Sequence, residues 1–225
     1  MSPAQPQRQR RKEARPQELL DAALGLFVEK GFAATRSEEV AARAGVSKGT
    51  LYLYYPSKEE LLKAVVRENL SGLIAEGSGI VDHFEGSASD LVALLLNTWW
   101  DRVGESPASG IFKIIITEVG NFPDFARFYV EEVIEPAHVL FEKVLQRGID
   151  AGEFRPVRLD DAVHVLIFPL LMLCLHKHSL GTCRGDEAAM DPRRFIATHV
   201  DVVLRGLQVA QPGPKAVSKR AAQPQ

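Results

Sequence analysis

Hydrophobic residues recur along this chain at the spacing of α-helices, and residues that start or stop helices bracket each run. Leu20, Ala23 and Phe27 lie on one face of a first predicted helix, which Pro16 opens and Gly31 ends. Strict alternation of hydrophobic and polar residues, the pattern of half-buried strands, is almost absent. The pattern therefore predicts an all-α fold.

Two short helices and a longer fourth helix are predicted next, each with a capping residue before its first apolar residue. The expected caps are Thr35 with Glu38 in a capping box, Ser47, and Ser57 with Glu60 in a second capping box. Gly45 suits the left-handed turn that ends the first of these helices. The next one runs to about Tyr54, because Pro56 forbids its continuation. The last is expected to continue as a connector to about residue 76.

Beyond residue 77 the predicted helices are longer, and the same signals mark them. Their expected starts are Ser87 with Asp90, Ser106 with Pro107, Pro123, Asp160, and Asp191 with Pro192. The stretch from Pro123 runs to about Gly152, and Pro136 is predicted to kink or divide it. The sum is about nine helices. Residues 211–225, rich in Pro, Ala and Gln, are predicted to be disordered.

Charge divides the chain into two parts. Residues 1–67 carry 12 Lys and Arg against 8 Asp and Glu, whereas residues 68–225 carry 15 against 21. The front part suits a polyanionic partner and the rest does not. Residues 1–14 are expected to form a flexible basic arm, whose simpler interpretation is a solvated tail. Two domains are predicted behind it, at residues 15–67 and 68–210.

The second and third predicted helices carry the functional signal. At roughly eight and seven residues they are too short to be stable alone, so they must dock on the first and fourth helices. A Gly-containing turn between two such helices is typical of the helix-turn-helix, whose second helix enters a DNA major groove. On a helical wheel Leu51 and Tyr55 point inward, whereas Lys48, Gly49 and Thr50 point outward.

Other residues of the third helix leave two interpretations open. Tyr52 and Tyr54 flank the outer arc and are suited to donate to phosphates, but they also fit the aromatic core of a small bundle that binds nothing. Leu53 lies on the outward arc. It is expected to contact a thymine methyl or, equally, to seat on a neighbouring domain.

The stretch from Thr35 to Leu62, TRSEEVAARAGVSKGTLYLYYPSKEELL, closely resembles the DNA-binding region of the TetR family of bacterial transcriptional regulators. The resemblance covers about residues 15–67. It implies that residues 47–54 form the recognition helix and that Lys58 and Ser37 contact phosphates. Ser37 and Leu53 depart from the residues most common in the family. The candidate DNA-binding residues are Ser37, Ser47, Lys48, Gly49, Thr50, Tyr52, Leu53, Tyr54 and Lys58.

The same resemblance implies a C-terminal domain that binds a small molecule and forms a homodimer. We expect the last two long helices, at residues 160–180 and 192–207, to pair with their two-fold mates. Aromatic and aliphatic residues there predict a hydrophobic or aromatic effector, although each of them also fits ordinary core packing. The candidate lining residues are Trp99, Trp100, Phe112, Ile116, Phe125, Phe128, Tyr129, His164 and Phe168.

Several other classes of protein are not expected. No apolar run reaches the ~18 residues that span a bilayer, and no secretory signal is recognised, so a cytoplasmic location without membrane contact is predicted. Cys174 and His178 have metal-ligand spacing but no second ligand pair, so no metal or cofactor is expected. Common catalytic motifs are absent from the sequence, and no enzyme activity is predicted.

The prediction is therefore a ligand-responsive transcriptional repressor that binds a palindromic double-stranded DNA operator as a homodimer. The alternative is a helical ligand-binding or adaptor protein whose N-terminal bundle contacts another protein instead of DNA.

Overall fold

The computed structural model describes residues 6–179, 181 and 190–209. Its α-helices are α1 (Pro6–Lys30), α2 (Ser37–Arg43), α3 (Lys48–Tyr54), α4 (Lys58–Val66), α5 (Gly72–His83), α6 (Ala88–Trp99), α7 (Ile111–Glu118), α8 (Pro123–Tyr129), α9 (Glu135–Asp150), α10 (Leu159–Lys177) and α11 (Pro192–Leu207). The described residues include no strand; a single isolated bridge joins Phe154 to Gln208. The predicted all-α fold is confirmed.

Short π-helical and 3₁₀ segments link some of these helices. They are η1 (Arg67–Ser71), η2 (Trp100–Gly104), η3 (Pro107–Gly110) and η4 (Val130–Ile134). Because η1 joins α4 to α5 and η4 joins α8 to α9, the eleven α-helices of the described chain make nine separate rods. The stretch from Pro123 is not divided at Pro136: it continues through π-helical η4, which ends at Ile134, two residues before the proline that has no N–H to donate.

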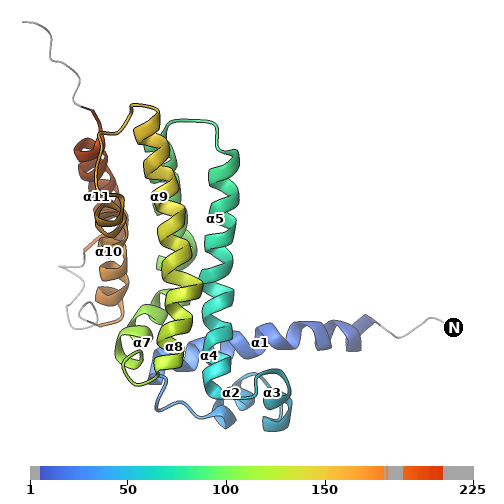
Figure 1. Cartoon of the computed structure of the whole chain (residues 1–225). Coiled ribbons are helices and arrows are strands. Elements are labelled where there is room, and N and C mark those ends of the chain that lie inside the picture. Colours follow the sequence, from blue (N-terminus) through green and yellow to red (C-terminus); the bar gives the residue numbers. More distant parts are fainter. Residues whose placement is uncertain (1–5, 180, 182–189, 210–225) are drawn as a thin grey trace, which may run out of the picture.

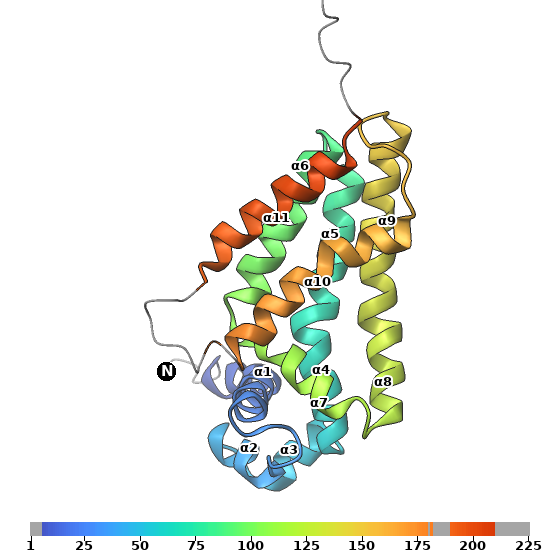
Figure 2. The ribbon, with the colours of Figure 1, turned by 90° about the vertical axis from the view of Figure 1, so that its left-hand side faces the viewer.

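The rods form two parts of the molecule, a small group of helices at one end and a bundle of longer rods above it. α1, α2 and α3 gather at one end, and the α4–α5 and α8–α9 rods rise from it side by side (Figure 1). Helices α10 and α11 cross the outer side of the upper part, where no further element covers them in the view of Figure 2. One continuous hydrophobic core connects both ends of the molecule.

Most predicted helix starts are confirmed at the level of hydrogen bonds. The hydroxyls of Ser47, Ser57 and Ser87 accept from the backbone N–H three residues on, at 3.1, 3.1 and 3.0 Å. The Asp191 carboxylate accepts from the N–H groups of the first turn of α11. These caps are local signals, which is why the sequence alone reveals them.

Two predicted boundaries are wrong. The first helix begins at Pro6 and not at Pro16, so residues 6–14 of the expected flexible arm are helical. Gln, Arg, Lys, Glu and Ala dominate this stretch, and their helix propensity carries the helix past the internal proline. The second helix is capped one residue later than expected: the Arg36 N–H donates to the Glu39 carboxylate at 3.1 Å.

Thr35, the predicted cap, has another role. Its hydroxyl is buried and lies 2.8 Å from the carbonyl of Gly31 and 3.2 Å from that of Leu26, so it ties the loop to the end of α1. The expected disordered tail, residues 211–225, lies outside the described residues.

Helix α10 departs from the expectation that no segment has the length and hydropathy of a membrane span. Its 19 residues, Leu159–Lys177, have a mean hydropathy of 1.6 over an 18-residue window, although His164 and Pro169 interrupt the run. One side of the helix packs into the core through Val163, Leu166 and Leu170. Core helices of soluble proteins satisfy the same two criteria.

Candidate DNA-binding surface and ligand pocket

The turn between α2 and α3 is built by a glycine at the position predicted from the sequence. Gly45 has φ +66°, and its N–H donates to the Ala42 carbonyl at 3.1 Å. The Val46 N–H donates to the Ala41 carbonyl at 2.9 Å. This pair of bonds is a Schellman motif, which ends α2 and sets the direction of α3.

Helix α3 is anchored in the core by one fully buried residue and presents several others outward. Leu51 is fully buried, and it anchors the helix. Lys48, Gly49 and Tyr52 are exposed, and Leu53 has 82% of its surface accessible. At this exposure Leu53 has no seat on another part of the chain among the described residues, and its contact with DNA stays a prediction. The helix lies at the far end of the molecule, clear of the upper rods (Figure 1).

Of the other predicted residues at this helix, the N-cap Ser47 is exposed and Thr50 and Tyr54 are half-buried. The Ser47 hydroxyl caps α3 and lies 2.9 Å from the Thr50 hydroxyl, so both serve the first turn of the helix. Tyr54 is half-buried and packs against the core. The surface predicted to face DNA therefore consists of the exposed residues of α3 and the hydroxyls of Ser47 and Thr50 at its first turn.

Lys48 is paired in this structure with a carboxylate of α2. Its ammonium forms an ion pair with Glu38, and it also lies 5.7 Å from the centre of the Tyr52 ring. The hydrogen bond to Glu38 raises the pKa of Lys48 above its usual value and lowers that of Glu38. A lysine ammonium has three N–H donors, so a base or phosphate would compete with or join Glu38 as a partner of Lys48.

Lys58 and Ser37 are placed differently from the family-based expectation. The Lys58 ammonium donates to the carbonyls of Phe32, Ala33 and Thr35, at 2.9, 3.3 and 3.0 Å. These three bonds tie the ammonium to the loop before α2. The phosphate contact of Lys58 stays a prediction. The Ser37 residue is buried, with 7% of its surface accessible. Their side chains support the helix-turn-helix from inside.

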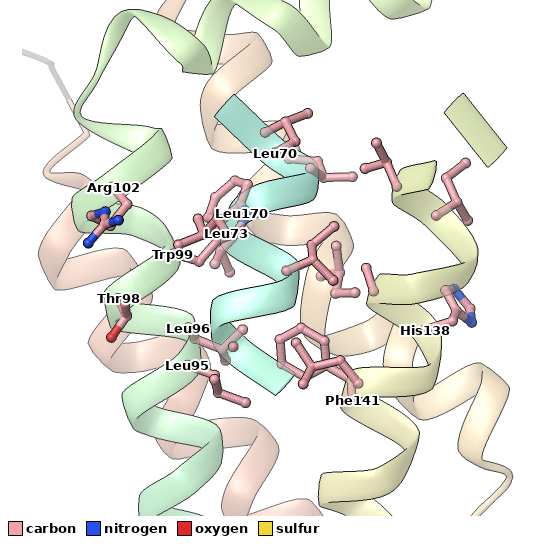
Figure 3. A pocket seen from close by; sticks show the side chains of 18 of the residues that line it. Leu70, Leu73, Leu95, Leu96, Thr98, Trp99, Arg102, His138, Phe141 and Leu170 are labelled. Atoms are coloured by element: carbon pink, nitrogen blue, oxygen red, sulfur yellow. The ribbon is translucent and has the colours of Figure 1, made fainter. Parts of the chain in front are cut away.

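A pocket of about 340 Å³ lies between the α4–α5 and α8–α9 rods, helix α6 and helix α10. Its walls are nearly all aliphatic and aromatic, and Figure 3 shows leucine and phenylalanine side chains converging on it. Ligand pockets in proteins commonly have such a volume and composition. The predicted residues that line it are Trp99, Phe112, Tyr129, His164 and Phe168.

Four predicted lining residues lie elsewhere. Trp100 and Phe125 are buried in the core outside the pocket, and Ile116 is 62% exposed on α7. Phe128 is also buried, with the Arg67 guanidinium 4.7 Å from the centre of its ring. Neighbouring helical residues point about 100° apart, so Trp99 and Trp100 do not share one environment.

Polar residues also lie at the margin of the pocket, outside the set of residues named above as its candidate lining. Arg102 and Glu76 form an ion pair of 3.0 Å on one side, and His138 lies on the other side in the view of Figure 3. Tyr129 is the polar residue within the wall, and burial raises its pKa. These residues come from separate helices, so no linear motif marks them.

Cys174 and His178, which share metal-ligand spacing in the sequence, do not converge on an open position. Cys174 is fully buried, and burial raises the pKa of its thiol to about 12. The His178 Nε2 lies 2.8 Å from the Ser109 hydroxyl, and burial lowers its pKa. A protonated thiol is a poor metal ligand. Cys183 lies outside the described residues.

The fold and the two sites define a protein of the helix-turn-helix DNA-binding class that has an apolar pocket among its remaining helices. The chain belongs to the tetR family of bacterial regulatory proteins. The family's N-terminal model matches residues 19–65, and the model of the tetracyclin repressor-like C-terminal domain matches residues 85–191.

Among its relatives is the uncharacterized HTH-type transcriptional regulator YfiR of Bacillus subtilis, 31% identical over 65% of this chain and 71% of the relative. The HTH-type transcriptional repressor KstR2 of Rhodococcus jostii is 32% identical over 64% of this chain and 70% of the relative. The protein is thus a transcriptional regulator and not an enzyme. The relatives support this function and give no support to a protein-binding adaptor.

Solved structures share the fold at low sequence identity. The ketosteroid transcriptional regulator KstR2 of Mycobacterium tuberculosis has a TM-score of 0.66 at 22% identity, over 87% of this chain and 96% of that chain. FadR of Bacillus subtilis, solved in complex with stearoyl-CoA, has a TM-score of 0.68 at 17% identity, over 85% of this chain and 99% of that chain.

Proposed function

We propose that this regulator is a homodimeric repressor, and that an apolar ligand of the acyl or steroid kind releases it from a palindromic operator. The observation that carries the proposal is that a single rod, α4–α5, both packs on the N-terminal helices and lines the pocket. Relatives are named repressors, and neighbouring structures are named for a ketosteroid and for stearoyl-CoA. An almost wholly apolar pocket suits the hydrocarbon part of either kind of ligand.

The outer face of α10 and α11 supports the dimer. Val165, Phe168 and Met172 follow one another at helical spacing on α10, and they are 55%, 58% and 62% exposed. Val202 on α11 is 61% exposed. An apolar surface of this extent on uncovered helices is typical of a protein interface. Two-fold pairing of this face presents two copies of α3 to half-sites about 34 Å or somewhat more apart.

The α4–η1–α5 rod supports the coupling between the two sites. Leu70, Leu73 and Ile74 on this rod line the pocket, whereas α4 packs against α1. The Arg67 guanidinium holds the Glu132 carboxylate in two bonds of 2.6 and 2.7 Å, which join η1 to η4. A ligand that wedges the two rods apart shifts α4 and thereby the spacing of the α3 helices. Such coupling commonly amounts to ~1–3 kcal/mol.

The test is the release of DNA by defined ligands. Fluorescence anisotropy with the DNA upstream of the protein's own coding region should show salt-dependent binding, and stearoyl-CoA or a ketosteroid should weaken it about 5–150-fold. Leu73→Trp fills the pocket and should reduce the response to ligand while DNA binding persists. If this DNA binds no more tightly than random DNA, or if no apolar ligand alters binding, the proposal is wrong.

A further inference from the structure

A cluster of three potential metal ligands joins α9 to α10 at the margin of the pocket. His138 lies on α9, and Asp160 and His164 lie one helical turn apart on α10. The Asp160 Oδ1 is 3.6 Å from the His138 Nδ1 and 3.8 Å from the His164 Nδ1. One ligand atom from each residue lies within 4.8 Å of the other two.

The two imidazoles differ from other histidines of the protein. His83, His178 and His199 each have a hydrogen-bond partner at 2.8–3.0 Å. Within the part of the chain that the structure describes, the side chains of His138 and His164 have no partner at that distance. Both are nearest to Asp160, and their rings meet edge to face with centroids 4.6 Å apart. Their nitrogens are therefore available to a further ligand.

We propose that His138, Asp160 and His164 bind a divalent transition metal ion of the Zn²⁺ type. Two imidazole nitrogens and a carboxylate oxygen are a donor set that zinc accepts in catalytic and other three-ligand sites. Metal–ligand bonds of about 2.0–2.1 Å place donor atoms roughly 3.3 Å apart, so the side chains must close by about an ångström. The 63% exposure of the Asp160 side chain leaves room for this movement.

The cluster lies at the margin of the pocket, and this position indicates two effects of a bound ion. His138 and His164 also line the pocket, so the coordination positions that they leave open face water or the polar group of a ligand. The ion also links α9 to the first turns of α10. The Phe168 ring, 4.7 Å from that of His164, limits the tilt of the imidazole. The inference needs neither the operator nor the effector proposed above.

The test is metal binding by tag-free protein, followed with Co²⁺ as a spectroscopic probe and with Zn²⁺ by calorimetry. We expect one ion per chain. The visible absorption bands of bound Co²⁺ should indicate a low coordination number and nitrogen ligands. His164→Gln and Asp160→Asn should each weaken binding at least about tenfold, since even partners outside the coordination shell contribute ~10–100-fold. His83→Gln is the matched control and should leave binding unchanged.

Two outcomes overturn the proposal. The first is that the wild-type protein binds neither Co²⁺ nor Zn²⁺ at one equivalent. The second is that the affinity for the ion is unchanged in both His164→Gln and Asp160→Asn, or that it falls equally in His83→Gln. Far-UV circular dichroism of each variant separates loss of a ligand from loss of fold. Because His138→Gln changes a ligand on the other helix, it should reproduce the His164→Gln result if one ion bridges α9 and α10.

Discussion

At the scale of single residues, the DNA-facing surface carries its own competing anion. Lys48 is the cation at the start of α3, and in the absence of DNA its partner is Glu38. Both side chains are more than half exposed, so water and salt screen their attraction strongly. A polyanion competes for the same ammonium and is repelled by the carboxylate. We therefore expect Glu38 to weaken the binding of DNA by Lys48.

Glu38→Gln should strengthen DNA binding about two- to fivefold at low salt, because it frees Lys48 and removes a like charge from the phosphates. Anisotropy titrations from about 50 to 200 mM salt measure the effect, which should shrink as screening increases. Glu85→Gln makes the same change in net charge on an exposed residue away from α3 and should have little effect. Equal gains in the two variants would mean that net charge, and not the Lys48 pair, is responsible.

Local signals explain which residues were predictable. Ser47, Gly45 and Ser57 act through neighbours within three or four residues, so their roles follow from spacing alone. Lys58 shows the limit of this reasoning, since the carbonyls that it binds lie 23 to 26 residues earlier in the chain. These carbonyl contacts depend on the folded loop, so spacing alone does not predict them.

At the scale of elements, the contact between α1 and η3 ties the DNA-binding helices to the upper part of the molecule. Gly110 ends η3 against the side chain of Val28 on α1. A Cβ on Gly110 would lie 2.4 Å from the Val28 Cγ2 and 2.7 Å from its Cγ1. Valine is branched at Cβ and has little rotamer freedom in a helix, so it does not move aside easily.

Gly110→Ala should therefore lower the free energy of unfolding by about 1–3 kcal/mol, the usual cost of overpacking a core contact. Urea denaturation measures it. Gly79→Ala on α5 is the control: a Cβ there meets nothing within 4 Å, and alanine in a helix should stabilise by up to ~1 kcal/mol. A Gly110→Ala protein as stable as the wild type would show that α1 and η3 adjust freely.

Element boundaries show a similar division between local and distant causes. The start of α11 follows from Asp191 and Pro192, which act within one turn. The start of α1 did not follow from Pro16, because helix propensity over residues 6–15 overrides one internal proline. The pocket depends on residues that are far apart in the sequence. Helical periodicity placed Trp99 and Phe112 on apolar helix faces, but the packing of separate rods decides which apolar residues surround the pocket.

At the scale of the whole molecule, the described residues leave the outer apolar face of α10 exposed. Helix α10 is hydrophobic on both sides, and only one of these sides is buried in the core of the described chain. Phe168 belongs to both regions, since it lines the pocket and is 58% exposed on the outer face. Dimer contact and ligand contact thus meet at one side chain. If the proposed dimer uses this face, its formation and ligand binding should influence each other.

Met172→Glu tests the proposed dimer, because two-fold pairing would bring two carboxylates into an apolar contact. The like charges should weaken dimerisation about 100-fold or more, converting a dimer at about 1 µM into a monomer at that concentration. Sedimentation equilibrium measures the change, and affinity for a palindromic site should fall with it while each folded subunit keeps its helical content. Ile116→Glu on α7 is the matched control, since Ile116 and Met172 are both 62% exposed but lie on different helices. Monomeric wild-type protein at about 50 µM, or equal losses in the two variants, would place the subunit contact elsewhere or exclude it.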